Sequence, residues 1–257
     1  MPMPNFFVIG AMRSGTTSLY RYLGQHPGVY MSPIKEPTFF DESARWEKRV
    51  ATIEKYQALF NNVSGEKAIG EASTAYLPNR GAAERIRECV PGAKLIAILR
   101  HPIDRAYSHF LHYVRRGEEP ILDFARALRE GEHSARYLRL GFYHAQLTNY
   151  FDLFAREQIS VHLYEDLNGD PRALMQRIFR FLGVDDGFVP DVSTRYNAAS
   201  AHSRGRQPAY PRQTNVLRRM WRTFAPRGRR WRSIARPTRI PTTPTPSPAL
   251  RRELAQL

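Results

Sequence analysis

The chain has 257 residues, with 39 Lys or Arg against 24 Asp or Glu, which gives a formal charge of +15 at pH 7. This length suits one sizeable domain and argues against a second of similar size. A single cysteine excludes a disulfide framework. The sequence contains no run of about 18 apolar residues, so we predict no membrane-spanning helix. The first residues lack the basic and apolar regions of a signal peptide, so we expect a cytoplasmic protein.

The positive charge is concentrated near the C-terminal end. Residues 192–252 contain 15 Arg, no Lys and no acidic residue, whereas residues 1–191 contain 24 basic and 23 acidic residues. We therefore predict a nearly neutral functional domain at residues 1–206 and a partly flexible Arg- and Pro-rich extension at residues 207–257. The extension is either a solvated tail or a surface for nucleic acid or an anionic membrane.

Strand and helix patterns alternate along the domain. Compact apolar runs predict buried strands at Phe6–Ile9, Ala68–Glu71, Leu95–Leu99 and Ile159–Tyr164. Helical spacing predicts helices at Thr17–Leu23, Trp46–Leu59, Gly81–Val90, Asp104–Arg115, Leu122–Arg129, Tyr143–Phe154 and Pro171–Leu182. Cys89 follows Ile86 at helical spacing and is predicted to be an inert core residue. The alternation favours a single three-layer α/β/α domain with a central parallel sheet, whose ligands bind at the carboxyl ends of the strands.

A glycine-bounded loop, Gly10 to Gly15, separates the first predicted strand from the first helix. Its two glycines permit a tight turn, and the unpaired N–H groups at the helix start favour an anion. The frame is that of a P-loop, but Thr16 stands where a nucleoside triphosphatase has Lys. Arg13, inside the loop, is its only cation and can bind phosphate in bidentate fashion. The loop predicts an anion site that does not hold a magnesium nucleoside triphosphate.

Four segments follow one another in a characteristic order: Gly10-Ala-Met-Arg-Ser-Gly-Thr-Thr-Ser-Leu19, Ser32-Pro-Ile-Lys-Glu-Pro-Thr-Phe-Phe-Asp41, Leu99-Arg-His-Pro-Ile-Asp-Arg-Ala-Tyr-Ser-His109 and Ser203-Arg-Gly-Arg206. Together they resemble the sulfotransferases that use 3′-phosphoadenosine 5′-phosphosulfate (PAPS), in the bacterial and heparan-sulfate-type branch. The segments Gly70–Tyr76 and Tyr164–Leu167 also fit. The resemblance covers about Phe6 to Arg206 and implies a fold like that of the P-loop NTPases.

The resemblance implies how PAPS is bound and how its product, 3′-phosphoadenosine 5′-phosphate (PAP), is held. The residues that it places around the 5′-phosphosulfate are Arg13, Ser14, Gly15, Thr16, Thr17 and Ser18. It implies that Arg100 and Ser108 bind the 3′-phosphate, and that Arg204, Gly205 and Arg206 form a loop that closes over the nucleotide. Relatives of the heparan-sulfate type usually have Lys at the position of Arg13, so Arg13 is expected to stabilise charge rather than to donate a proton.

The chemistry that the resemblance implies is in-line transfer of a sulfuryl group to an acceptor hydroxyl or amine, without a metal. Glu36 is the expected base, kept extended because Pro37 follows it, and Lys35 is expected to contact the sulfuryl group or the acceptor. Competing bases are His101, His109, His112 and His144. His144 and Tyr143 are also expected near the acceptor, which is a carbohydrate, a glycolipid or a small metabolite.

Two other functions compete with this interpretation. A P-loop kinase-like enzyme needs Lys at position 16 and magnesium-binding carboxylates, and the sequence shows neither convincingly. A nucleic-acid- or membrane-binding protein would act through the Arg-rich segment, with steep salt dependence. We expect no specific nucleic-acid partner and leave peripheral membrane contact open.

Overall fold

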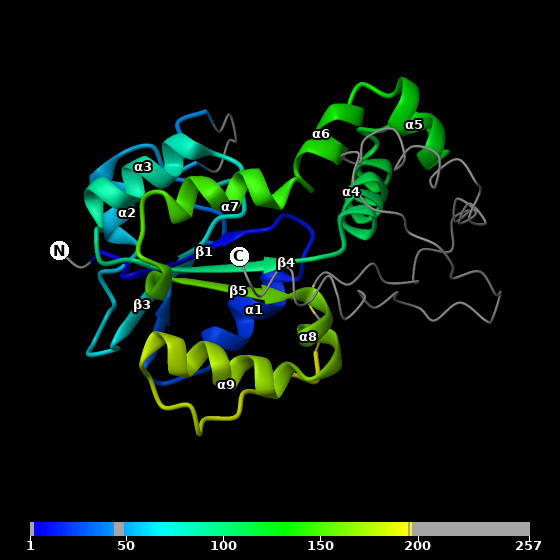
Figure 1. Cartoon of the computed structure of the whole chain (residues 1–257). Coiled ribbons are helices and arrows are strands. Elements are labelled where there is room, and N and C mark those ends of the chain that lie inside the picture. Colours follow the sequence, from blue (N-terminus) through cyan, green and yellow to red (C-terminus); the bar gives the residue numbers. More distant parts are fainter. Residues whose placement is uncertain (1–2, 44–48, 195, 197–257) are drawn as a thin grey trace.

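The computed structural model describes residues 3–43, 49–194 and 196, and these build a parallel five-stranded sheet between two layers of helices (Figure 1). The strand order is β2-β3-β1-β4-β5, and every neighbouring pair is parallel. The strands are β1 (Phe6–Gly10), β2 (Val29–Met31), β3 (Ala68–Ala72), β4 (Lys94–Leu99) and β5 (Ile159–Leu163). The predicted α/β fold with a central parallel sheet is confirmed.

Helices cover both faces of the sheet. One face carries α2 (Ile53–Ala58), α3 (Arg80–Cys89) and α7 (Tyr143–Phe151), and the other carries α1 (Thr16–Leu23), α8 (Tyr164–Gly169) and α9 (Pro171–Leu182). Beyond the carboxyl end of β4, α4 (Pro102–Arg116) packs with α5 (Phe124–Glu130) and α6 (Ser134–Arg139) around a small core of their own. A short 3₁₀ turn, Arg156–Gln158, leads into β5.

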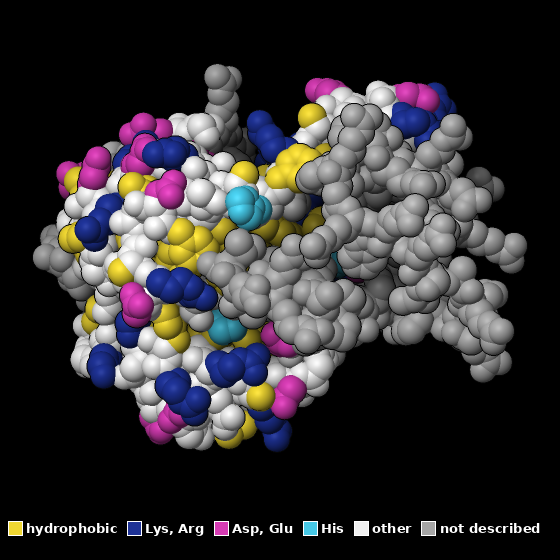
Figure 2. Space-filling view, viewed as in Figure 1, with side chains coloured by type: hydrophobic (Ala, Val, Ile, Leu, Met, Phe, Trp, Pro, Cys, Tyr) yellow, Lys and Arg dark blue, Asp and Glu magenta, His cyan; other side chains and the backbone are white. Residues whose placement is uncertain are grey.

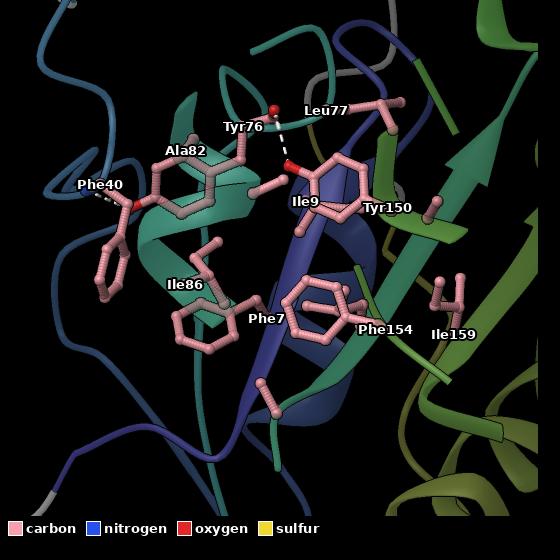
Figure 3. Close-up of a cluster of buried hydrophobic side chains, with 14 of the residues drawn as sticks. Phe7, Ile9, Phe40, Tyr76, Leu77, Ala82, Ile86, Tyr150, Phe154 and Ile159 are labelled. Carbon is pink, nitrogen blue, oxygen red and sulfur yellow. Dashed lines mark hydrogen bonds between the residues drawn. The ribbon is translucent and has the colours of Figure 1, made fainter. Parts of the chain in front are cut away.

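Strand β1 is buried on both faces because its apolar side chains alternate between two cores. Phe7 and Ile9 join the core under α3 and α7, shown in Figure 3, and Phe6 and Val8 join the core over α1 and α9. Burying one such side chain stabilises the fold by about 1.5–3 kcal/mol. A Cβ on Gly70 of β3 would lie only 2.1 Å from the Phe6 ring, so the glycine permits this packing. The apolar run therefore fixes the central strand that leads into the glycine loop.

Several predicted elements need correction. In the region of the predicted helix Trp46–Leu59, the helix α2 begins at Ile53, and positions 44–48 lie outside the described residues. Thr52 has an extended backbone and caps the helix, because its side chain accepts a hydrogen bond from the Lys55 N–H. Strand β2 escaped prediction because three residues at a sheet edge show no clear period. Tyr164 begins α8 instead of ending β5. Helix α6 was also missed.

Cys89 is exposed, so its predicted place in the core is wrong. It is the last residue of α3, whose buried side is formed by Ala82, Ala83 and Ile86. On the face in Figure 2, basic and acidic side chains are interspersed, as the near balance of charges in residues 1–191 predicts. Among the described residues, no helix combines the length and the apolar character needed to cross a bilayer.

Candidate active site

The glycine loop connects the carboxyl end of β1 to the first turn of α1. Gly15 has a φ of +87° and precedes the helix as its N-cap, without a side-chain cap. A Cβ at this position would lie 2.6 Å from Cδ2 of Leu167, so both the backbone angle and the space require glycine. The Ala11 N–H donates to the Ile98 carbonyl of β4 at 2.8 Å, which ties the loop to the neighbouring strand. The uncapped helix start is thus held at the sheet edge where an anion can approach it.

Arg13 lies in this loop with a φ of +67°, and its side chain turns toward α4. Its Nε donates to the Ser108 Oγ at 3.2 Å. Burial, followed by repulsion from Arg115 and Arg100, lowers the pKa of Arg13 from 12.5 to about 10. The guanidinium remains charged at neutral pH, and a bound anion would offset both of these costs.

Arg100 follows β4 and is held from several sides. Its guanidinium stacks on the Tyr164 ring at 4.6 Å, and its Nη1 donates to the Arg13 carbonyl at 3.4 Å. The Tyr143 hydroxyl donates to the Arg100 carbonyl at 2.9 Å. Arg13, Arg100 and Ser108, which the sequence places in two separate segments, therefore meet at the ends of β1 and β4.

Ser14 offers a test of whether the loop suits an anion. Its Oγ is fully buried and makes no hydrogen bond of good geometry within the described part of the chain. It lies close enough to the Tyr143 hydroxyl to lower the pKa of that phenol, although burial, the larger effect, raises it. A buried donor that lacks a good acceptor, beside two arginines, fits an anionic ligand.

The remaining loop residues differ in their surroundings. Thr16 is buried in the first turn of α1, and Thr17 is half-buried beside it. The Ser18 Oγ accepts from the Tyr196 N–H at 3.0 Å and donates to its carbonyl at 3.4 Å, so this hydroxyl ties α1 to residue 196. Arg204, Gly205 and Arg206 lie outside the described residues.

Glu36 lies at the carboxyl end of β3, the neighbour of β1. Its N–H donates to the Ala72 carbonyl at 2.9 Å, and its Oε2 accepts from the Thr74 N–H at 2.7 Å. The Thr74 hydroxyl donates to the same carboxylate, and Lys35 forms an ion pair with it. The predicted extended backbone at Glu36 is wrong: its φ is +62°, because these contacts outweigh the bias from Pro37.

The competing histidines occupy unequal places. His109 is buried beside Arg105, and burial followed by the charge of Arg105 lowers its pKa to about 3. Burial and the charge of Arg13 also lower the pKa of His112. His101 is half-buried at the start of α4, with an Nδ1 that makes no hydrogen bond in the described part of the chain. His144 is exposed on α7, next to the buried Tyr143.

Three residues at this edge received no role from the sequence. Thr74 holds Glu36, Tyr164 holds Arg100, and Glu71 lies fully buried beneath the Glu36 loop. Their signal was present, since the segments Gly70–Tyr76 and Tyr164–Leu167 matched the family pattern, but spacing alone does not tell which side chain faces which. Within residues 3–43, 49–194 and 196, no group of three or more His, Cys, Asp or Glu side chains could hold a metal ion.

Comparisons with known proteins give a consistent result. A model of the Sulfotransferase family matches residues 4–188. The bifunctional heparan sulfate N-deacetylase/N-sulfotransferase 4 of Mus musculus is 30% identical over 198 residues, which cover 71% of this chain and 22% of that protein. A membrane-associated sulfotransferase of Dictyostelium discoideum is 34% identical over 126 residues, 48% of this chain and 26% of the relative. The chain spans about a fifth of the length of the heparan sulfate relatives it matches.

Among solved structures, a sulfotransferase from Alicyclobacillus acidocaldarius is similar over most of both chains. The match covers 76% of this chain and 86% of that one, with 38% identity and a TM-score of 0.71.

Proposed function

The chain belongs to the sulfotransferase family, and on that premise we propose that it transfers a sulfuryl group from PAPS to an acceptor hydroxyl or amine. One observation carries the proposal: Arg13, Arg100 and Ser108 converge on an uncapped helix start that lacks the P-loop lysine. Two arginines suit a donor with more than one anionic group, and neither group needs a divalent metal to be bound.

The 5′-phosphosulfate of PAPS binds to the loop amides, Arg13 and the hydroxyls of Ser14, Thr16 and Thr17, and the 3′-phosphate binds to Arg100 and Ser108. As the bond between sulfur and the bridging phosphate oxygen breaks, negative charge grows on that oxygen, and the permanent charge of Arg13 stabilises it. The acceptor oxygen or nitrogen forms the new bond to sulfur from the opposite side, and PAP leaves. We further propose that Arg204, Gly205 and Arg206 close over the nucleotide.

Glu36 accepts the proton that the acceptor loses in this step. Its support is the way it is held: the Thr74 N–H and hydroxyl fix the carboxylate, and Lys35 pairs with one oxygen at the ion-pair distance of 2.5 Å. The Glu36 side chain is about a quarter exposed (23%), so an acceptor can reach it. Lys35, 19% exposed, lies where it can contact the transferred group. His109 is a weaker base because its low pKa leaves it little affinity for a proton.

We propose a carbohydrate amine or hydroxyl as the acceptor, and a glycolipid or small metabolite as the next choices. The similarity to heparan sulfate N-sulfotransferases supports the first class. Tyr143 and His144 are proposed to lie near this acceptor. The protein is proposed to work in the cytoplasm, with peripheral membrane contact through residues 207–257, the Arg-rich part of the chain.

The test offers the protein two donors separately, PAPS alone and ATP with Mg²⁺, together with a panel of amino and hydroxyl sugars. Mass spectrometry then searches for sulfated and phosphorylated products, and PAP release is followed in parallel. We expect sulfated product and PAP with PAPS, and no phosphorylated product with ATP. Phosphorylation from ATP would contradict the proposal.

A further inference from the structure

A buried carboxylate lies beneath the loop that carries Glu36. Glu71, on β3, is completely buried and accepts three hydrogen bonds from hydroxyl groups. Tyr76 donates to its Oε1 at 2.6 Å, Tyr56 donates to the same oxygen at 3.1 Å, and Ser73 donates to Oε2 at 2.7 Å. Three donors satisfy the hydrogen-bonding capacity of this buried carboxylate. Its role therefore depends on the other hydrogen bonds that the three hydroxyl groups make.

Two of the three hydroxyls also accept a backbone N–H from the Glu36 loop. The Thr38 N–H donates to the Ser73 Oγ at 3.1 Å. The Phe40 N–H donates to the Tyr76 hydroxyl at 3.3 Å (Figure 3). The Tyr56 hydroxyl makes no second hydrogen bond among the described residues; its ring stacks on Phe39 with centroids 4.3 Å apart. Glu71 is thus connected to the loop backbone through Ser73 and Tyr76, but not through Tyr56.

In its ionised form, the Glu71 carboxylate decides which way these hydrogen bonds run. An ionised carboxylate only accepts, and each hydroxyl has one proton to give. When Ser73 and Tyr76 direct their protons at Glu71, their oxygen lone pairs remain for the amides of Thr38 and Phe40. A neutral group at position 71 would place a donor against one of these protons and disturb that order.

The loop needs such support because its backbone is strained. Glu36 has a φ of +62° and Thr38 a φ of +50°, in the region that residues with a Cβ rarely adopt. Backbone conformations of this kind persist only where the surroundings impose them. The bonds from Thr38 and Phe40 into the Glu71 cluster, together with the bond from the Glu36 N–H to Ala72, impose it here.

We propose that Glu71 is a positioning residue: through Ser73 and Tyr76 it holds the backbone of residues 36–40 and thereby aims the Glu36 carboxylate at the acceptor. The proposal rests on the proposed function, because it gives Glu71 a task only if Glu36 takes the proton. Glu71 itself touches neither donor nor acceptor.

The test compares two conservative variants, Tyr76→Phe and Tyr56→Phe. Both residues are fully buried, both donate to the same oxygen of Glu71, and both variants keep the ring. Tyr76→Phe also removes the acceptor for the Phe40 N–H, while Tyr56→Phe leaves the loop bonds in place. The Tyr76 carbonyl, which accepts from Tyr150, is unaffected in both.

We expect Tyr76→Phe to lower kcat by about tenfold, the effect of misaligning one hydrogen-bonded group, with PAP affinity unchanged. Tyr56→Phe should keep kcat within about twofold of the parent. Ser73→Ala should resemble Tyr76→Phe, and Glu71→Gln should show the same split between kcat and PAP affinity. Amide hydrogen exchange gives a readout besides activity: Thr38 and Phe40 should exchange faster in Tyr76→Phe than in Tyr56→Phe.

Equal kcat and equal exchange in the two tyrosine variants would overturn the positioning role, although an active parent protein would still support the proposed function. If the parent protein transfers no sulfuryl group from PAPS, the proposed function fails instead. The exchange rates at Thr38 and Phe40 would then still decide whether the hydroxyls of this cluster hold the loop.

Discussion

The candidate site has two halves of opposite charge at the same edge of the sheet, and they differ in how their charged groups are paired. At the ends of β1 and β4, Arg13 and Arg100 repel each other, and the buried Ser14 hydroxyl finds no good acceptor among the residues that the structure describes. At the end of β3, the carboxylates of Glu36 and Glu71 are surrounded by donors within the protein. On the proposed function an anionic ligand completes the first half, whereas the second half finds its hydrogen-bond partners within the protein. Substitutions in the first half should therefore change ligand affinity, and those in the second should change turnover alone.

Arg13→Ala tests this contrast most severely. It removes the loop's cation, which in the proposed reaction both binds the donor and stabilises the leaving oxygen, so kcat/KM should fall by about 10³-fold. Affinity for PAP, measured by calorimetry, should fall as well. Arg129→Ala, at an exposed position on α5, is the matched control and should change neither quantity. A variant at position 13 with normal PAP affinity would remove the distinction between the two halves.

The pH dependence of stability tests whether Glu71 is as enclosed as its contacts indicate. Burial raises the pKa of Glu71 from 4.5 to about 7, against the opposing effect of its hydroxyl donors. Between these values the unfolded chain releases the proton first, so the free energy of unfolding falls as pH rises from about 4.5 to about 7 and then levels off. His109 and His162, whose pKa values are lowered to about 3 and about 4, add an opposite slope in this range. In urea unfolding the Glu71 contribution, about 3 kcal/mol by the value of the pKa change, should therefore appear as the difference between the parent and Glu71→Gln.

The Glu71 contribution to the pH dependence should be absent in Glu71→Gln, while Glu88→Gln, at an exposed position on α3, should keep it. Other carboxylates contribute equally to all three proteins, so the difference between the curves isolates Glu71. Parallel curves for the parent and Glu71→Gln would mean that the carboxylate has an ordinary pKa in the folded protein.

Glu36→Gln tests the half of the site at the end of β3, where we expect a loss of turnover without a loss of PAP affinity. It removes the proton acceptor and keeps the size of the side chain, so kcat should fall by about 10²-fold or more. PAP affinity should stay the same, because the Glu36 carboxylate contacts Thr74 and Lys35 and is no part of the proposed nucleotide site. If the variant keeps its turnover at neutral pH, the base is another group, and His144→Ala becomes the next variant to measure.

Ser108→Ala is expected to have the smallest effect. It removes one hydrogen bond to Arg13 and one donor for the 3′-phosphate, so PAP affinity should fall by about five- to tenfold. The parent and variant should bind adenosine 5′-phosphosulfate, which lacks the 3′-phosphate, almost equally. A similar loss for both ligands would indicate that Ser108 acts only through Arg13.

The sequence predicted the half of the site at the ends of β1 and β4 better than the half at the end of β3, for a physical reason. Two strands are buried on both faces and are therefore recognisable as continuous apolar runs, Phe6–Ile9 and Leu95–Leu99. Arg100 directly follows the second run, and Arg13 lies in the loop after the first. The left-handed backbone of Glu36 was missed because tertiary hydrogen bonds impose it: Thr74 donates to its carboxylate, and its N–H donates to the Ala72 carbonyl. Contacts of that kind leave no local pattern.

The Glu71 cluster was missed for a related reason. Its hydroxyls come from three places in the chain, α2, the residue after β3 and the turn beyond it, and only the fold brings Tyr56 to Ser73 and Tyr76. Short or edge elements such as β2 were missed as well, because three residues are too few to show a period.

The central claim is that the glycine loop is built for a 3′-phosphorylated nucleotide without magnesium. Thermal unfolding of the full chain with PAP, and separately with ATP and Mg²⁺ at the same concentration, tests it most directly, because a ligand stabilises the folded state according to its affinity. PAP should raise Tm clearly, and ATP with Mg²⁺ should raise it little. Equal protection by the two ligands would contradict the claim.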